Sequence, residues 1–184
     1  ILHPGLSLSF LFYALLSKDY WSGLLACILE SGKFFKSLRR ITSFFLVSHG
    51  LSKHLEALDM SANAVGYSYW SNAGALALVL SRKLFRKIIC RAHSYELYVE
   101  RSALNFIPFR GLLYNFMDYI YFVSEHGRTY FANRYSGNVE KLKVSYLGVS
   151  SFSPNIRLGK VSQKPFHLVS CSSVVPVKRL ELLV

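Results

Sequence analysis

The chain has 184 residues, of which 52% are hydrophobic and 17% charged, so it can bury a core and is not intrinsically disordered. Its 22 Lys and Arg against 10 Asp and Glu give a formal charge of +12, which favours an anionic partner: nucleic acid, an anionic membrane surface or phosphorylated substrates. A basic surface kept for solubility is the alternative. The sequence has no RNA-binding strand motif, no paired-cysteine zinc motif and no recognition-helix pattern, so we expect no nucleic-acid partner and no metal site.

The first third of the chain predicts apolar helices beside basic clusters. Residues 6–17, 20–31, 34–46 and 52–58 have helical spacing or composition. The apolar run at 6–16 is too short to span a bilayer, and Lys18 and Asp19 interrupt it. We therefore expect a cytoplasmic protein whose helices pack together or lie on an anionic membrane surface. The basic clusters are Lys33, Lys36, Arg39 and Arg40, and then Arg82, Lys83, Arg86, Lys87 and Arg91.

From residue 64 onward, predicted strands alternate with predicted helices, which indicates βαβ units. The fold class is therefore α/β: a Rossmann-like parallel sheet with helices on both faces, whose ligands bind at the carboxyl ends of the strands. Ser71 and Ser124 are expected to cap the helices that follow them. The expected strands are 64–70, 87–92, 119–123 and 142–146, and the expected helices are 71–85, 111–117 and 125–135, with a polar loop at 93–101.

The C-terminal part predicts the start of a second domain. Residues 1–150 form the first domain and 151–164, polar with Pro and Gly, form a linker. Residues 165–184 contain an expected strand at 166–171 and the start of a helix at 177–184. The cysteines Cys27, Cys90 and Cys171 are far apart in apolar surroundings, which favours reduced, buried thiols.

Four segments carry a resemblance to a known family. They are YSYW at 67–70, RAHSYELY at 91–98 with IPFR at 107–110, FVSEHGRTYFANRY at 122–135, and the run from KVSYLGV at 143–149 to SCSSVVPVKRLELL at 170–183. No segment is specific alone, but their order and spacing resemble the GT-B glycosyltransferases of family 4, which includes many bacterial capsule, lipopolysaccharide and exopolysaccharide transferases. The chain would then be an incomplete GT-B N-terminal domain, lacking its first strand, with the start of a truncated donor-binding domain.

The resemblance implies sugar transfer, with retention, from a UDP- or GDP-sugar to a glycan or lipid-linked acceptor, without cofactor or metal. Such a reaction passes through an oxocarbenium-like transition state while charge builds on the departing diphosphate. His93 matches the acceptor-domain histidine that hydrogen-bonds the donor sugar near the reacting carbon. Lys178 matches the lysine that contacts the donor diphosphate. Arg179 follows it where many relatives carry Gly, and Ser173 stands where many carry Arg, which leaves open whether Arg179 substitutes for the absent charge.

Most of the remaining site residues have two interpretations. Glu96 orients His93 or binds the acceptor, or it caps a helix. Tyr95 and Tyr98 stack on sugar rings or are buried aromatics. Arg91 and Arg110 bind a phosphate of a lipid-linked acceptor, or pair with Glu96 and Glu100. Ser124 is a helix cap facing the cleft, and Gly148 precedes the linker, where a glycine serves a turn with positive φ or a close backbone approach.

Three rival functions stay open. One is a degenerate, non-catalytic GT-B-like module that binds a sugar or nucleotide, favoured by Ser173. Another is an epimerase of the same architecture, for which the segment offers few acid–base carboxylates, and the third is a nucleic-acid-binding protein. In the family, a glycine-rich acceptor loop would precede Ile1 and paired glutamates would follow Val184. We therefore expect the 184-residue chain to be inactive alone.

Overall fold

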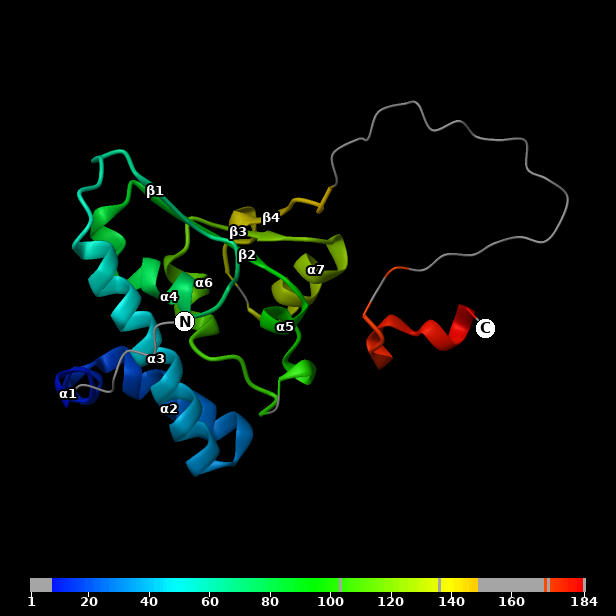
Figure 1. The fold of residues 1–184 in the computed structure, drawn as a ribbon, viewed down its shortest axis with the longest axis horizontal. Coiled ribbons are helices and arrows are strands. Elements are labelled where there is room, and N and C mark those ends of the chain that lie inside the picture. Colours follow the sequence, from blue (N-terminus) through cyan, green and yellow to red (C-terminus); the bar gives the residue numbers. More distant parts are fainter. Residues whose placement is uncertain (1–7, 103, 136, 149–170, 172, 184) are drawn as a thin grey trace, which may run out of the picture. The chain divides into compact units, whose positions relative to one another are not determined.

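The computed structural model describes residues 8–102, 104–135, 137–148, 171 and 173–183 (Figure 1). The chain divides into two compact units, Ile1–Gly148 and Val149–Val184. The first unit contains all the strands of the described residues and the longer helices. In the described part of the chain, no helix is long and apolar enough to cross a membrane.

The first unit begins with three helices, α1 (Leu8–Leu16), α2 (Lys18–Ser31) and α3 (Phe34–Glu56). Ser17 begins α2 by accepting a hydrogen bond from the backbone N–H of Tyr20 at 3.3 Å, and Gly32, at φ 63°, ends it in the left-handed region that glycine favours.

Helix α3 is continuous, so the predicted break between residues 46 and 52 is wrong. The serine and glycine in that stretch suggest a turn. Inside the helix, however, Ser48 donates its hydroxyl hydrogen to the carbonyl of Phe44 at 2.7 Å, which satisfies the side chain without ending the helix. Packing of Ile41 and Phe45, which are fully buried, outweighs the modest helix propensity of the stretch.

Four parallel strands form one sheet in the order β1-β2-β3-β4. Each strand therefore lies beside its neighbour in the sequence, and the strand order does not reverse within the described sheet. All four carboxyl ends meet at one edge, which we call the carboxyl edge, and all four amino ends meet at the opposite amino edge. The elements are β1 (Val65–Ser68), α4 (Ala73–Leu80), β2 (Lys87–Ala92), α6 (Arg110–Phe116), β3 (Tyr119–Phe122), α7 (Glu125–Arg134) and β4 (Leu142–Val144).

One face of the sheet is covered by helices. Ile88, Cys90 and Ala92 of β2 are fully buried and alternate with half-buried neighbours, and β3 repeats the pattern. In Figure 1, α4, α6 and α7 lie on one side of the sheet, and α3 packs against α4 beyond it. The other face presents half-buried side chains such as Arg91 and Tyr121. Within the described residues, the prediction of helices on both faces therefore holds for one face only.

Smaller differences from the predicted elements have local causes. Helix α4 is capped by Asn72, whose side-chain oxygen accepts the N–H of Gly74 at 3.0 Å, so the predicted Ser71 cap is wrong by one residue. Ser71 is buried instead. The predicted loop at 93–101 contains the short helix α5 (Ser94–Leu97) and a 3₁₀ turn at Val99–Arg101.

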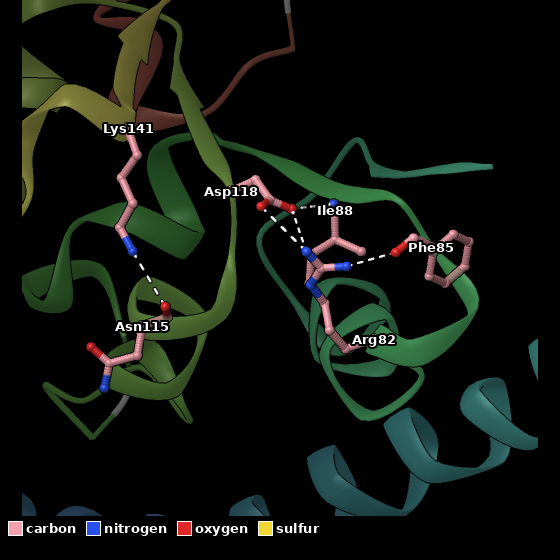
Figure 2. A network of polar contacts seen from close by, with 6 residues as sticks. All are labelled: Arg82, Phe85, Ile88, Asn115, Asp118 and Lys141. Atoms are coloured by element: carbon pink, nitrogen blue, oxygen red, sulfur yellow. Dashed lines mark hydrogen bonds and ion pairs between the residues drawn. The ribbon is translucent and has the colours of Figure 1, made fainter. Parts of the chain in front are cut away.

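The amino edge is held by a polar network around Asp118, which precedes β3 (Figure 2). Its carboxylate accepts the backbone N–H of Ile88 in β2 at 2.7 Å and two hydrogen bonds from Arg82 at 3.2 and 3.3 Å. Arg82 also donates to the carbonyl of Phe85 at 2.7 Å. The network therefore ties the start of β2 to the start of β3 across 30 residues of sequence.

The second unit is described only near its end. Two 3₁₀ turns, Pro176–Lys178 and Leu180–Leu183, occupy the region where an α-helix is predicted. The predicted linker at 151–164 and most of the predicted strand at 166–171 lie outside the described residues. Cys27 and Cys90 are buried and free as predicted, whereas Cys171 is exposed, so the prediction of a buried thiol there is wrong. Burial raises the pKa of Cys90 to about 11, which makes its thiol unreactive.

Candidate functional site

The carboxyl edge gathers residues that follow each of the four strands. Tyr69 and Trp70 follow β1, His93 follows β2, Ser124 lies just after β3 and Ser145 follows β4. Loops at this edge are where open parallel sheets bind their ligands. Polar groups at this edge that lack partners within the protein are therefore candidates for contact with a ligand.

His93 lies against two aromatic rings. Its ring centroid is 4.4 Å from that of Trp70 and 4.8 Å from that of Tyr69, with the planes inclined at 46° and 40°. Both ring nitrogens, Nδ1 and Nε2, are shielded from solvent and make no hydrogen bond of standard geometry among the described residues, although the His93 side chain faces the backbone N–H of Glu96 in a capping-box arrangement. Buried polar atoms are nearly always paired, so an orphaned imidazole requires an explanation, and a ligand partner is one.

The protonation state of His93 follows from its surroundings. Burial lowers the pKa of His93 from its ordinary value of 6.5; the charge of Glu96 opposes the shift and that of Arg91 adds to it. The ring is therefore neutral at neutral pH. A neutral imidazole offers one donor and one acceptor, which suits hydrogen bonding to a hydroxyl group.

Glu96 acts on the backbone beside His93. Its carboxylate accepts the backbone N–H of His93 at 3.1 Å, which closes the first turn of α5. No hydrogen bond joins it to the imidazole, whose nitrogens are both without partners in the described structure. Of the roles considered from the sequence, the structure thus shows the helix-capping one. Glu96 therefore holds the backbone of His93.

Arg91, on the face of β2 opposite the helices, reaches across to β4. One of its terminal nitrogens donates to the hydroxyl of Ser145 at 2.8 Å, and its guanidinium carbon lies 5.8 Å from the ring centroid of Tyr69. Its Nε is buried and has no partner among the described residues. The predicted ion pair of Arg91 with Glu96 or Glu100 is not seen there. Arg91 therefore presents a positive charge close to the aromatic residues around His93.

Tyr69 and Trp70 are the candidate functional residues that sequence reasoning did not identify. The two residues are 44% and 46% exposed, and their ring centroids are 5.2 Å apart in an edge-on arrangement. The hydroxyl of Ser68 donates to the carbonyl of Trp70 at 2.7 Å, which fixes the turn that carries both rings. The signal available was YSYW at the end of a strand: adjacent aromatics at a carboxyl edge favour a stacking surface over a core.

The two predicted tyrosines differ in surroundings. Tyr95 is 74% exposed and free to contact a ligand. Tyr98 is half-buried against α7: its hydroxyl lies 2.7 Å from Nδ1 of His126 and its ring 4.8 Å from that of Tyr130. These contacts favour a packing role for Tyr98.

Of the predictions made for Ser124 and Gly148, the structure confirms the first and contradicts the second. Ser124 caps α7, accepting the backbone N–H of Gly127 at 3.1 Å, as predicted. Gly148 has no positive φ, and a Cβ there would meet nothing within 4 Å, so neither reason predicted for a glycine applies.

Three further predicted site residues are Arg110 in the first unit and Lys178 and Arg179 in the second unit. Arg110 begins α6 and is buried, 3% exposed, without an ion pair to Glu96 or Glu100 among the described residues. In the second unit, Lys178 is exposed, and Nε of Arg179 lies 3.9 Å from the carboxylate of Glu181. Arg179 has φ 50°, the region that glycine favours.

The comparisons with known proteins add no identification. No family model, curated protein or solved structure matches the chain. In the described residues, no group of His, Cys, Asp and Glu could hold a metal ion. The class of protein that the structure defines is an α/β protein with a parallel, Rossmann-like sheet, in which His93 lies against Tyr69 and Trp70 at the carboxyl edge.

Proposed function

We propose that the chain belongs to a retaining glycosyltransferase of the GT-B fold, which moves a hexose from a UDP- or GDP-sugar to a glycan or lipid-linked glycan in surface polysaccharide synthesis. The observation that carries the proposal is the neutral, orphaned imidazole of His93 beneath two exposed aromatic rings at the carboxyl edge. A sugar needs these two kinds of contact: hydrogen bonds to its hydroxyls and an apolar ring surface for its carbon face.

In this proposal His93 hydrogen-bonds a hydroxyl of the donor sugar near the reacting carbon. Its lowered pKa keeps it uncharged, so it does not repel the oxocarbenium-like transition state. Tyr69 and Trp70 flank the sugar. Lys178, with Arg179, neutralises the departing diphosphate. Negative charge builds on this group in the transition state, so it needs fixed positive charge beside it.

The acceptor side of the proposal uses the basic and aromatic residues near the same edge. Arg91, Tyr95 and Glu96 are the residues proposed to contact the acceptor, while the contacts of Tyr98 support a more indirect role. Peripheral docking on an anionic membrane is part of the proposal as well. Its support is the exposure of Phe34 and Phe35 beside the basic cluster at the start of α3.

The experiment measures nucleotide release from a panel of UDP- and GDP-sugars, with and without membrane lipid extract. The 184-residue chain and the full product of its gene are both assayed. Release with one donor, lost in His93→Ala and in Lys178→Ala but kept in Lys83→Ala, is the expected result. A folded gene product that releases nucleotide from no donor would remove the transferase proposal.

A second candidate is a non-catalytic relative that binds a sugar or nucleotide without turnover. Two observations favour it. Ser173 supplies no charge where many family members carry Arg, and the guanidinium of Arg179 lies near the carboxylate of Glu181, which offsets part of its positive charge. Donor binding by calorimetry, without release in the assay above, would select this candidate.

A further inference from the structure

Arg110 is a buried cation without a matching anion. Its side chain is 3% exposed, and Nε and Nη2 have no hydrogen-bond partner among the described residues. Burial lowers its pKa, and the groups that oppose this shift are Tyr135, Cys90, Glu96 and Tyr130, of which only the Glu96 carboxylate is ordinarily ionised at neutral pH. That carboxylate already accepts the backbone N–H of His93.

The contact that Arg110 does make is weak. Its guanidinium carbon lies 5.3 Å from the ring centroid of Phe131, a cation–π geometry. Such a contact does not satisfy N–H donors, which point along the plane of the guanidinium. A desolvated guanidinium with idle donors is unfavourable unless an anion binds there.

Arg110 is one of the residues that line a cavity of about 200 Å³ between α2 and the start of α6. Its walls include Asp19 and Ser22 of α2, Phe109, and Tyr135 just after α7. Ser22, Ala26 and Gly111 are exposed, so the cavity opens to solvent. Tyr69, Trp70 and His93 take no part in its lining, so this cavity is distinct from the carboxyl-edge site.

The local backbone keeps Arg110 in this position. Phe109 precedes it with φ 56°, a left-handed conformation that a bulky residue rarely adopts. Its ring packs so closely on Gly23 of α2 that a side chain at residue 23 would collide with it. The strained residue and the glycine together hold α2 and α6 on the two sides of the cavity.

We propose that this cavity binds an oxyanion group of a ligand, a carboxylate or a phosphate, through the guanidinium group of Arg110. A guanidinium pairs with either group through two parallel hydrogen bonds. The cavity is smaller than the usual pocket of a drug-sized ligand, so it holds an anionic group with a few further atoms and not a whole nucleotide sugar. Asp19 also lines the cavity, and its carboxylate repels a doubly charged group more than a singly charged one. A singly charged ligand group is therefore favoured. The proposal does not depend on the transferase function.

The test is thermal unfolding of the 184-residue chain in inorganic phosphate or acetate, against chloride at equal ionic strength. At ten times the dissociation constant of the bound anion, we expect the Tm to rise by about 4 °C. Arg110→Met, which keeps the buried volume and removes the charge, abolishes the rise. The control variant Arg86→Met removes an exposed charge beside the amino end of β2. This variant is expected to keep the anion-dependent rise in Tm.

A second variant guards against a misfolded Arg110→Met protein. Ala26 is an exposed lining residue of α2, so Ala26→Trp obstructs the cavity without touching Arg110. It is expected to abolish the anion-dependent rise while the chain stays folded. A larger response to acetate than to phosphate identifies a carboxylate ligand, and the reverse identifies a phosphate. Equal Tm values in all three salts, or a rise that survives in both Arg110→Met and Ala26→Trp, would overturn the proposal.

Discussion

Asp118 at the amino edge of the sheet and His93 at the carboxyl edge have opposite polar surroundings. At the amino edge, the Asp118 carboxylate is paired with Arg82 and with the backbone of Ile88. At the carboxyl edge, both ring nitrogens of His93 are out of solvent and have no partner among the described residues. Paired polar groups fix a fold, whereas idle ones cost stability and are kept where a ligand completes them. The comparison therefore separates the edge that holds the sheet together from the edge we propose binds substrate.

The largest effect is expected from breaking the amino edge. Asp118→Ala leaves Arg82 without its acceptor and the N–H of Ile88 unpaired, so we expect a loss of about 2 kcal/mol in the free energy of unfolding. The expected loss is moderate because Arg82 and Asp118, the two partners of the ion pair, are both partly exposed. Urea denaturation measures it. The control Glu140→Ala, at an exposed carboxylate, changes stability by less than about 0.5 kcal/mol; equal losses in the two variants would remove the contrast.

The matching change at the carboxyl edge is expected to cost less. His93→Leu removes ring nitrogens that have no partner in the described structure, so stability changes by at most about 1 kcal/mol, in either direction. The same denaturation series measures it. A loss as large as that of Asp118→Ala would show that His93 is a structural residue with a partner, contrary to our interpretation.

The pH dependence of stability sharpens the comparison further. The folded-state pKa values of His93 and of the buried His49 lie below 6.5, so the unfolded chain binds protons first as the pH falls. The stability that the two neutral histidines give the folded state is fully present above pH 6.5. It is lost as the pH falls through their lowered folded-state pKa values. Denaturation between about pH 7.5 and about pH 5.5 should show this loss. The loss of unfolding free energy over this pH range should be smaller in His93→Gln. An unchanged dependence of stability on pH in that variant would contradict the lowered pKa of His93.

The smallest effect concerns the aromatic cover of His93. Trp70→Ala exposes the imidazole, and the pKa of His93 should rise toward 6.5 because the desolvation is relieved. NMR titration of the histidine ring protons measures the change, with Trp21→Ala as the control for loss of an indole. If the pKa of His93 is the same in wild type and Trp70→Ala, the ring does not shield it.

The sequence predicted the elements with strong local patterns. The strand at 87–92 and the helix capped by Ser124 need only a buried apolar run and a serine before a helix, and both are present. His93 is selected through the resemblance of the segment at 91–98 to a known family, whereas the position of the loops after the strands follows from parallel pairing. The role of His93 stays a prediction.

What the sequence did not predict depends on residues brought together by packing. The rings over His93 come from the end of β1, and they meet it because β1 and β2 pair in register. Asp118 and Ile88 are 30 residues apart, and the Arg110 cavity needs α2 beside α6. Continuity of α3 was missed because Ser48 and Gly50 suggest a turn until buried neighbours such as Phe45 are taken into account.

The most direct test of the account is an NMR titration of the chain with UDP- and GDP-sugars, following the ring protons of His93 and the backbone amide of Ile88. The account predicts that one donor shifts the His93 signals, that the Ile88 amide stays unchanged, and that Trp70→Ala weakens the response. Saturating donor that leaves His93 unchanged, or that shifts both edges equally, would contradict the assignment of the carboxyl edge as the sugar-binding site.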